Sequence, residues 1–257
     1  MNLLELNHVE KSFENLSVLK DISISIGEGE IVSIIGPSGS GKSTLLRCAT
    51  MLEKMDGGEI VYLGKKAAWT DKDGHVVYAD KKDMKEIRSQ YGLVFQNFNL
   101  FPHYSVLKNI VDAPIHVQKR DKETVYQEAR ELLKKMGLAD KADAYPCQLS
   151  GGQCQRVAIA RALALNPKIL FFDEPTSALD VSVQKQVVEQ FLMIREKFGT
   201  SILLVSHNIG VIRAMADEIL VLHQGKTVDY GKKDDILAQP TSEYTEKLLE
   251  AVPRFRR

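Results

Sequence analysis

One eight-residue segment near the N-terminus constrains the fold more than any other feature of the sequence. It matches the pattern G-x-x-x-x-G-K-[ST]. Its residues are Gly36, Pro37, Ser38, Gly39, Ser40, Gly41, Lys42 and Ser43. The β-branched run 31–35 comes directly before it, and a helical pattern begins near Lys42 and runs on through Thr44. This order predicts a buried strand, a glycine-rich turn and a helix.

Such a turn is suited to hold phosphate groups. Its glycines let successive backbone N–H groups point at one anion, and the helix N-terminus adds the positive end of its dipole. Lys42 can reach the β- and γ-phosphates, and the Ser43 hydroxyl can ligate Mg²⁺. The alternative is a chance Gly/Ser-rich turn. The segment therefore predicts a nucleotide site, but it does not by itself name the reaction.

A second apolar run ends in two acids. Residues 169–172 are Ile-Leu-Phe-Phe and are followed by Asp173 and Glu174. A buried strand of this kind delivers its last side chains to the carboxyl edge of a sheet, where ligands bind in α/β folds. We assign Asp173 to Mg²⁺ and Glu174 to the general base that accepts a proton from the attacking water. The alternative is a strand that ends in solvated surface acids.

The rest of the chain reads as one α/β domain. Apolar runs alternate with helical patterns at 125–136 and 183–198, residues 218–231 predict a hairpin, and residues 64–83 predict a polar surface excursion. Lys and Arg together number 34, as do Asp and Glu, so bulk attraction to nucleic acid is not expected. No apolar run spans a bilayer, no secretory signal is visible, and three cysteines predict free thiols in a reducing compartment.

A third motif lies between the first two. Residues 149–153 read Leu-Ser-Gly-Gly-Gln and open a helical segment, which makes a second possible anion site. One nucleotide has no obvious use for two such sites from one chain, so each chain could offer one to a partner's nucleotide. Together with the phosphate loop and the run ending in Asp173 and Glu174, this order resembles the ATP-binding cassette (ABC) ATPases from Phe13 to about Gly231.

The resemblance implies a fold and a set of site residues. The implied fold is an α/β P-loop core with a mixed, mainly parallel sheet, an N-terminal antiparallel β subdomain and a helical subdomain at about 97–160. Phe13 would stack on adenine, although an ordinary core Phe is the alternative. Gln96 would approach Mg²⁺, and His207 would contact the γ-phosphate, although a lone His after a strand is ordinarily structural. Contacts to the nucleotide of a second protomer would come from Ser150, Gly151, Gly152 and Gln153, and the nucleotide-binding residue Asp180 would lie in the loop that communicates across that dimer.

The resemblance also implies binding partners and a cellular location. Two chains, expected to be identical, would close head-to-tail around two ATP·Mg²⁺ and serve separate integral-membrane permease subunits, with a solute-binding protein acting indirectly. The chain would lie peripherally on the cytoplasmic face of the inner membrane. Segments 71–90 and 94–117 resemble cassettes of polar amino-acid importers, whereas 177–184 and 244–254 are more similar to oligopeptide-importer cassettes. A lipid-exporter cassette and a soluble ABC clamp acting in translation or DNA repair are further alternatives.

Overall fold

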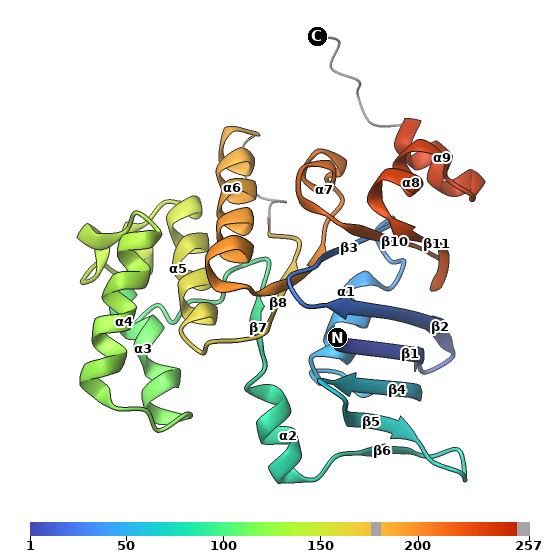
Figure 1. Ribbon diagram of the computed structural model, residues 1–257, viewed down its shortest axis with the longest axis horizontal. Helices are drawn as coiled ribbons and strands as arrows, with labels where there is room; N and C mark the ends of the chain where they lie inside the picture. The colour runs from blue at the N-terminus through green and yellow to red at the C-terminus, as the bar shows by residue number, and fades with distance from the viewer. Residues whose placement is uncertain (176–180, 251–257) are drawn as a thin grey trace.

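The computed structural model describes residues 1–175 and 181–250, with side chains for all of these except 181–187. Strands dominate the first eighty residues, and helices and strands alternate one by one between residues 151 and 223 (Figure 1). The helices are α1 Lys42–Ala49, α2 Lys81–Arg88, α3 Val106–His116, α4 Lys122–Lys135, α5 Gly151–Leu163, α6 Val181–Phe198, α7 Ile209–Met215, α8 Lys233–Ala238 and α9 Glu243–Glu250, with 3-10 turns at Ala139–Lys141 and Pro146–Gln148. None of the helices in the described ranges combines the length and apolar character needed to cross a bilayer.

The first sheet is antiparallel and is built mostly from the N-terminus. Its strand order is β2-β1-β4-β5-β6. The strands are β1 Asn2–Phe13, β2 Leu16–Gly27, β4 Gly57–Tyr62, β5 Lys65–Thr70 and β6 Val76–Tyr78. The buried residues of β1 and β2 recur mainly at every second position, as expected for strands that bury one face. This sheet is the N-terminal antiparallel subdomain that the sequence predicts.

The second sheet is mainly parallel and has the order β11-β10-β3-β9-β8-β7. Strands β3 and β8 to β10 are nearly continuous apolar runs because elements cover both faces of this sheet. Only the β10–β11 pair is antiparallel, which confirms the predicted hairpin and the predicted fold class. The strands are β3 Ile31–Ile35, β7 Tyr91–Val94, β8 Ile169–Asp173, β9 Ser201–Val205, β10 Glu218–His223 and β11 Lys226–Lys232.

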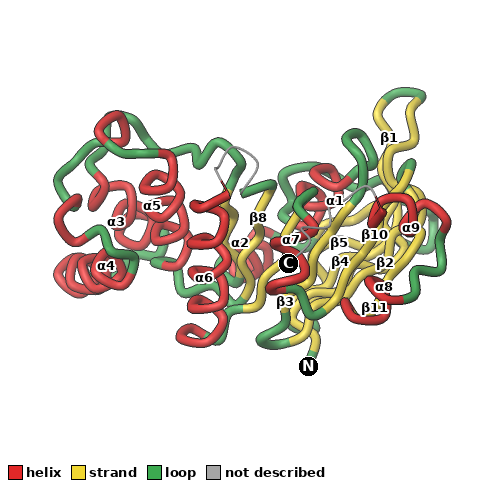
Figure 2. Tube along the Cα trace, turned by 90° about the horizontal axis from the view of Figure 1, so that it is seen from above, coloured by secondary structure: helices red, strands yellow, loops and turns green. Residues whose placement is uncertain are grey.

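The parallel sheet separates two large hydrophobic cores. On β8, Leu170 and Phe172 pack into the core with α3 to α5, whereas Ile169 and Phe171 pack into the core with α1 and the antiparallel sheet. Successive side chains of a strand point to opposite faces, so this strand serves both cores. Figure 2 shows the helices α3, α4 and α5 on one side of the molecule and the antiparallel strands on the other. The boundaries 97–160 for a helical subdomain remain a prediction.

The structure differs from the expected polar excursion at 64–83. This segment contains β5 and β6, which extend the antiparallel sheet beyond β4, and it ends in the first residues of α2. Ala67 and Ala68 of β5 are buried, and the backbone N–H of Met55 donates to Tyr78 Oη at 2.9 Å. Edge strands need only one buried face, so their many Lys and Asp residues are compatible with strand pairing.

Asp229 on β11 holds the beginning of α9 in place. It is 4% exposed, and its carboxylate accepts hydrogen bonds from the backbone N–H groups of Thr241 and Ser242, at 3.1 Å each. The hydroxyls of Thr241 and Thr245 donate to the same carboxylate. Burial acts to raise the pKa of Asp229, but these hydrogen bonds outweigh it and hold the pKa below its usual value.

We expect Asp229→Asn to lower the free energy of unfolding by about 1–3 kcal/mol at neutral pH, because the amide cannot accept at both positions. The folded pKa is depressed, so the carboxylate's contribution is fully present above the unfolded pKa, near 4, and is lost as the pH falls through the folded value. Urea unfolding at several pH values measures the difference in the free energy of unfolding between the variant and the natural chain. The control is Asp143→Asn, which changes an exposed aspartate. A difference between the variant and the natural chain that changed between about pH 6 and 8 would contradict this interpretation.

Candidate functional site

The predicted phosphate loop connects β3 to α1 and requires glycine at two positions. At Gly36, φ is +150° and a Cβ would lie 2.1 Å from Leu222 O. At Gly41, φ is +105° and a Cβ would lie 2.8 Å from Leu19 Cδ2. Any larger residue would therefore push the loop away from β2 and β10. Ser40 is buried in this loop, and its hydroxyl has no hydrogen-bond partner among the described residues.

Lys42 begins α1 and points its ammonium back into the loop. Its Nζ donates hydrogen bonds to Gly36 O and Pro37 O, each at 2.9 Å. Burial lowers the pKa of Lys42, and the charges of Glu174 and Asp173 act in the opposite direction. The ammonium is thus held by carbonyl oxygens beside two acids, where it can turn toward an anion bound by the loop.

Ser43 and Asp173 meet although they are 130 positions apart. Ser43 Oγ donates to Asp173 Oδ1 at 2.9 Å. Burial is the main influence that raises the pKa of Asp173, and the hydrogen bond from Ser43 opposes it. The hydroxyl and carboxylate oxygens are hard ligands of the kind that Mg²⁺ prefers. The structure therefore brings together two of the three residues assigned to the metal.

Glu174 follows β8 in an uncommon backbone conformation. Its φ is +47°, which is left-handed, and its N–H donates to Val205 O at 3.0 Å. Its side chain is 23% exposed, and Oε2 lies 3.5 Å from His207 Nδ1. The strained backbone and the bond to β9 fix the carboxylate at the sheet edge next to Asp173. The structure thus brings the side chains of Glu174 and His207 close together.

The third predicted element, residues 150–153, lies elsewhere. Ser150 is the N-cap of α5: its Oγ accepts from Gln153 N at 3.3 Å, and its N–H donates to Gln153 Oε1 at 2.9 Å. Gly151 and Gly152 form the first turn. Both views place α5 on the helical side and α1 on the opposite side of the molecule (Figures 1 and 2). The exposed N-terminus of α5 is therefore separate from the phosphate loop of its own chain.

Phe13 ends β1 and is 43% exposed, so it is not an ordinary core residue. Lys11 Nζ lies 4.9 Å from the centroid of its ring. The same ammonium is 3.2 Å from Glu53 Oε1 and from Asp56 Oδ1. This buried cation fixes the end of β1 against the segment after α1. No local pattern in the sequence indicates this role of Lys11, because its partners lie more than forty residues away.

The remaining predicted residues are placed only in part. Gln96 is exposed and lies two residues beyond β7, whose Val94 pairs with Phe172 of β8. It therefore lies at the same sheet edge as the acids. Asp180 falls outside the described residues. The cysteines, Cys48, Cys147 and Cys154, are all free, as expected.

Known proteins are similar to this chain in sequence and in fold. The profile of the ABC transporter family matches residues 19–177. The arginine transport ATP-binding protein ArtM of Bacillus subtilis is 44% identical over 250 residues, which cover 97% of this chain and 100% of that protein. The glutamine transport ATP-binding protein GlnQ of Escherichia coli is 41% identical, with coverage of 97% and 100%.

A solved structure agrees with these relatives. The structure of cbiO1 from Clostridium perfringens, part of the ABC transporter complex cbiONQ, superposes with a TM-score of 0.82 at 26% identity. The match covers 98% of this chain and 96% of that one. Fold, phosphate loop and sequence therefore agree, and the chain belongs to the ABC transporter family as an ATP-binding protein.

Proposed function

We propose that this chain hydrolyses ATP to drive a membrane importer of polar amino acids. The observation that carries the proposal is the grouping of a phosphate loop, Asp173, Glu174 and His207 at one edge of the parallel sheet. The relatives named for arginine and glutamine transport favour amino acids over oligopeptides. They also disfavour a soluble ABC clamp and a lipid exporter.

The phosphate loop would bind the triphosphate. Backbone N–H groups of residues 36–41 and the N-terminus of α1 attract the anion, and the Lys42 ammonium turns from its two carbonyl partners toward the β- and γ-phosphates. Exchanging two neutral acceptors for charged phosphate oxygens strengthens its hydrogen bonds. Thr44, the next residue along α1, adds another N–H group in the first helical turn.

Mg²⁺ suits the donors that this site presents. Among the described residues there is no group of three or more His, Cys, Asp or Glu that could hold a metal. Ser43 and Asp173 offer one hydroxyl and one carboxylate, and Gln96 an amide oxygen from the neighbouring loop. This fits an ion that keeps waters and takes other ligands from substrate phosphates. When bound, Mg²⁺ neutralises charge on the β- and γ-phosphate oxygens.

Glu174 and His207 would have different roles in hydrolysis. Glu174 orients the attacking water and accepts its proton, because its carboxylate is fixed at the sheet edge by the bond from its N–H to Val205 O. His207, 3.5 Å away, donates to the γ-phosphate. Both residues come from strand ends and not from long loops, so little reorganisation is needed during the reaction.

A second copy would complete each ATP site. The N-terminus of α5 is exposed and lies away from its own phosphate loop, so Ser150, Gly151, Gly152 and Gln153 would face the γ-phosphate held by the partner. Phe13 would stack on adenine at the opposite end of the nucleotide. We infer a homodimer that closes on ATP and opens after hydrolysis, and it requires no nucleic acid.

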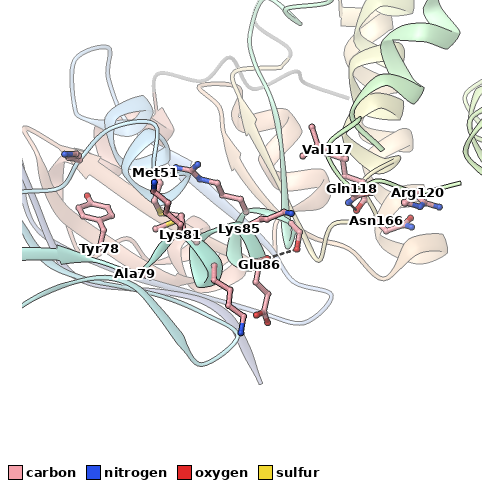
Figure 3. A pocket seen from close by; sticks show the side chains of 16 residues that line it. Met51, Tyr78, Ala79, Lys81, Lys85, Glu86, Val117, Gln118, Arg120 and Asn166 are labelled. Atoms are coloured by element: carbon pink, nitrogen blue, oxygen red, sulfur yellow. Dashed lines mark hydrogen bonds between the residues drawn. The ribbon is translucent and has the colours of Figure 1, made fainter. Parts of the chain in front are cut away.

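A positively charged groove supports docking to the permease at the cytoplasmic face of the membrane (Figure 3). It lies beside α2, between the antiparallel sheet and the turn after α3 (Figure 1). Met51, Met84, Val117 and Leu165 provide apolar surface. Its cations are Lys54, Lys81, Lys82, Lys85, Arg88 and Arg120. Among the described residues that line it, Glu86 is the one acid. An amphipathic permease helix with acidic side chains matches this combination.

One experiment tests the importer and its substrate class. The chain is purified from membranes with its permease and binding protein and reconstituted in proteoliposomes, and ATPase activity is measured with arginine, glutamine or an oligopeptide outside. We expect stimulation by a polar amino acid through the binding protein. Stimulation by the peptide alone would instead favour the oligopeptide alternative, and copurification with ribosomes or DNA would contradict transport.

We expect the double change Lys81→Glu with Lys85→Glu to weaken permease binding by about tenfold or more, because like charges would then face the acidic helix. ATPase activity of the isolated chain should stay unchanged, since neither lysine is near the phosphate loop. The matched control is Lys122→Glu with Lys134→Glu, which alters the first and penultimate residues of α4. Equal loss of permease binding in both double variants would contradict the proposed docking surface.

A further inference from the structure

A buried amide connects α5 to the segment that carries Glu174. Gln155 lies in the second turn of α5 and is 0% exposed. Its Nε2 donates to Pro175 O at 2.8 Å, across a separation of twenty positions. Pro175 directly follows Glu174, and proline has no N–H, so this carbonyl is its one backbone hydrogen-bonding group. The bond therefore attaches the helix to the turn that carries the general base.

Packing alone would favour an apolar side chain at position 155 over the amide of Gln155. Gln155 Oε1 is buried and has no partner among the described residues. A buried acceptor left unpaired costs about 1–3 kcal/mol, whereas an apolar side chain of the same length would avoid that cost. The next residues of the helix, from Val157 to Ala160, are buried and apolar, so the surroundings suit such a replacement. The hydrogen bond to Pro175 is the gain that opposes this cost.

The turn at Glu174 is fixed from two sides. The N–H of Glu174 donates to Val205 O on β9, and Pro175 O accepts from Gln155 on α5. Between these two bonds the backbone holds a left-handed φ of +47°. Such a conformation persists where neighbouring contacts over-determine it. A shift of α5 would act on this backbone and thereby on the distance between the carboxylate and His207.

We propose that Gln155 is a positioning residue that couples the N-terminus of α5, which serves the partner's ATP, to Glu174, which serves the ATP of its own protomer. Gln155 follows Ser150 by five residues, or about 7.5 Å along a rigid helix. Ordering of Ser150 and Gly152 around the partner's γ-phosphate would therefore restrict Gln155 and the turn it holds. Binding of ATP at one site of the dimer would therefore affect the position of Glu174 at the other site. This inference rests on the head-to-tail dimer proposed above.

Gln155→Met tests the inference because methionine keeps the length but removes the donor. We expect kcat to fall by about ten- to a hundredfold, as for a small misplacement of a catalytic group, with KM for ATP nearly unchanged. Thermal stability should change little, because removal of the orphaned Oε1 offsets the loss of the hydrogen bond to Pro175 O. Gln155→Asn, which keeps the amide but is one methylene shorter, should also lower kcat and serves if the methionine variant does not fold.

The chain offers a matched control in Gln190 on α6. Its Oε1 is also buried and has no hydrogen-bond partner in the described part of the chain. Gln190 lines neither the nucleotide site nor the groove described above. We expect Gln190→Met to leave the kcat of the isolated chain unchanged. If Gln155→Met behaved like Gln190→Met, the positioning role would be overturned.

A double-mutant cycle separates coupling from simple support of Glu174. Ser150→Ala and Gln155→Met are combined, and the logarithms of their effects on kcat are compared. If Ser150 acts on Glu174 through Gln155, the effect of the double variant on log kcat should be clearly smaller than the sum of the two single effects. The first substitution then already removes the coupling that the second one would remove. Additive effects would overturn the coupling. Failure of Glu174→Gln to lower turnover would instead contradict the proposed function itself, so the two failures are distinguishable.

Discussion

A Glu174→Gln variant is expected to bind ATP as the natural chain does and to hydrolyse it about 10²–10⁴-fold more slowly. Glutamine keeps the size of the side chain and can still contact His207, but it cannot accept the proton of the attacking water. The negative charge beside Asp173 also disappears, which favours phosphate binding. Phosphate release in single-turnover and steady-state assays measures the loss, and nucleotide binding is followed by fluorescence of an ATP analogue.

If the proposed dimer opens after hydrolysis, the same variant should trap it in the closed state. Size-exclusion chromatography with ATP would then show a dimer for Glu174→Gln and a mixture for the natural chain. Glu28→Gln changes an exposed glutamate in the turn between β2 and β3 and is the control. Near-normal phosphate release by Glu174→Gln would refute its assignment as general base.

Removal of the Lys42 side chain should affect binding as well as turnover. We expect Lys42→Ala to weaken ATP binding by about tenfold or more and to lower turnover by a further 10²–10³-fold, because the ammonium stabilises charge that grows on the phosphates. Gly36 O and Pro37 O lose their donor too, so the loop itself loosens. Isothermal titration with ATP and Mg²⁺ gives the affinity.

Lys122→Ala, at the exposed first position of α4, is the control for loss of a lysine. It should retain the natural affinity, since it is neither near the loop nor part of an ion pair in the described part of the chain. A Lys42→Ala chain that bound ATP as tightly as this control would contradict the assignment of the loop.

The parts of the fold and site that could be predicted from the sequence are those with local signals. Continuous apolar runs identify β3, β8 and β9, because both faces of these strands are covered and every side chain is buried or nearly so. Parallel strands end at one edge, so Ser43, Asp173 and His207 could be expected together before any distance was known. The hairpin of β10 and β11 follows from its central Gln224-Gly225.

What could not be predicted depends on pairs that are distant in the chain. The strands β5 and β6 carry many Lys and Asp residues, and only pairing with β4 makes them strands. Gln155 looks like any polar residue of a helix until Pro175 is placed beside it. Lys11 likewise acquires its role from Glu53 and Asp56. A single sequence contains no local periodicity that reports such contacts.

The left-handed backbone at Glu174 also bears on how this protein could be made to withstand heat. A side chain with a Cβ at φ +47° costs stability that glycine at the same position would recover. Selection for thermal resistance alone would therefore favour loss of Glu174, the proposed general base. A laboratory evolution campaign on this chain needs to select for ATP turnover together with heat tolerance, since the two demands conflict at this one position.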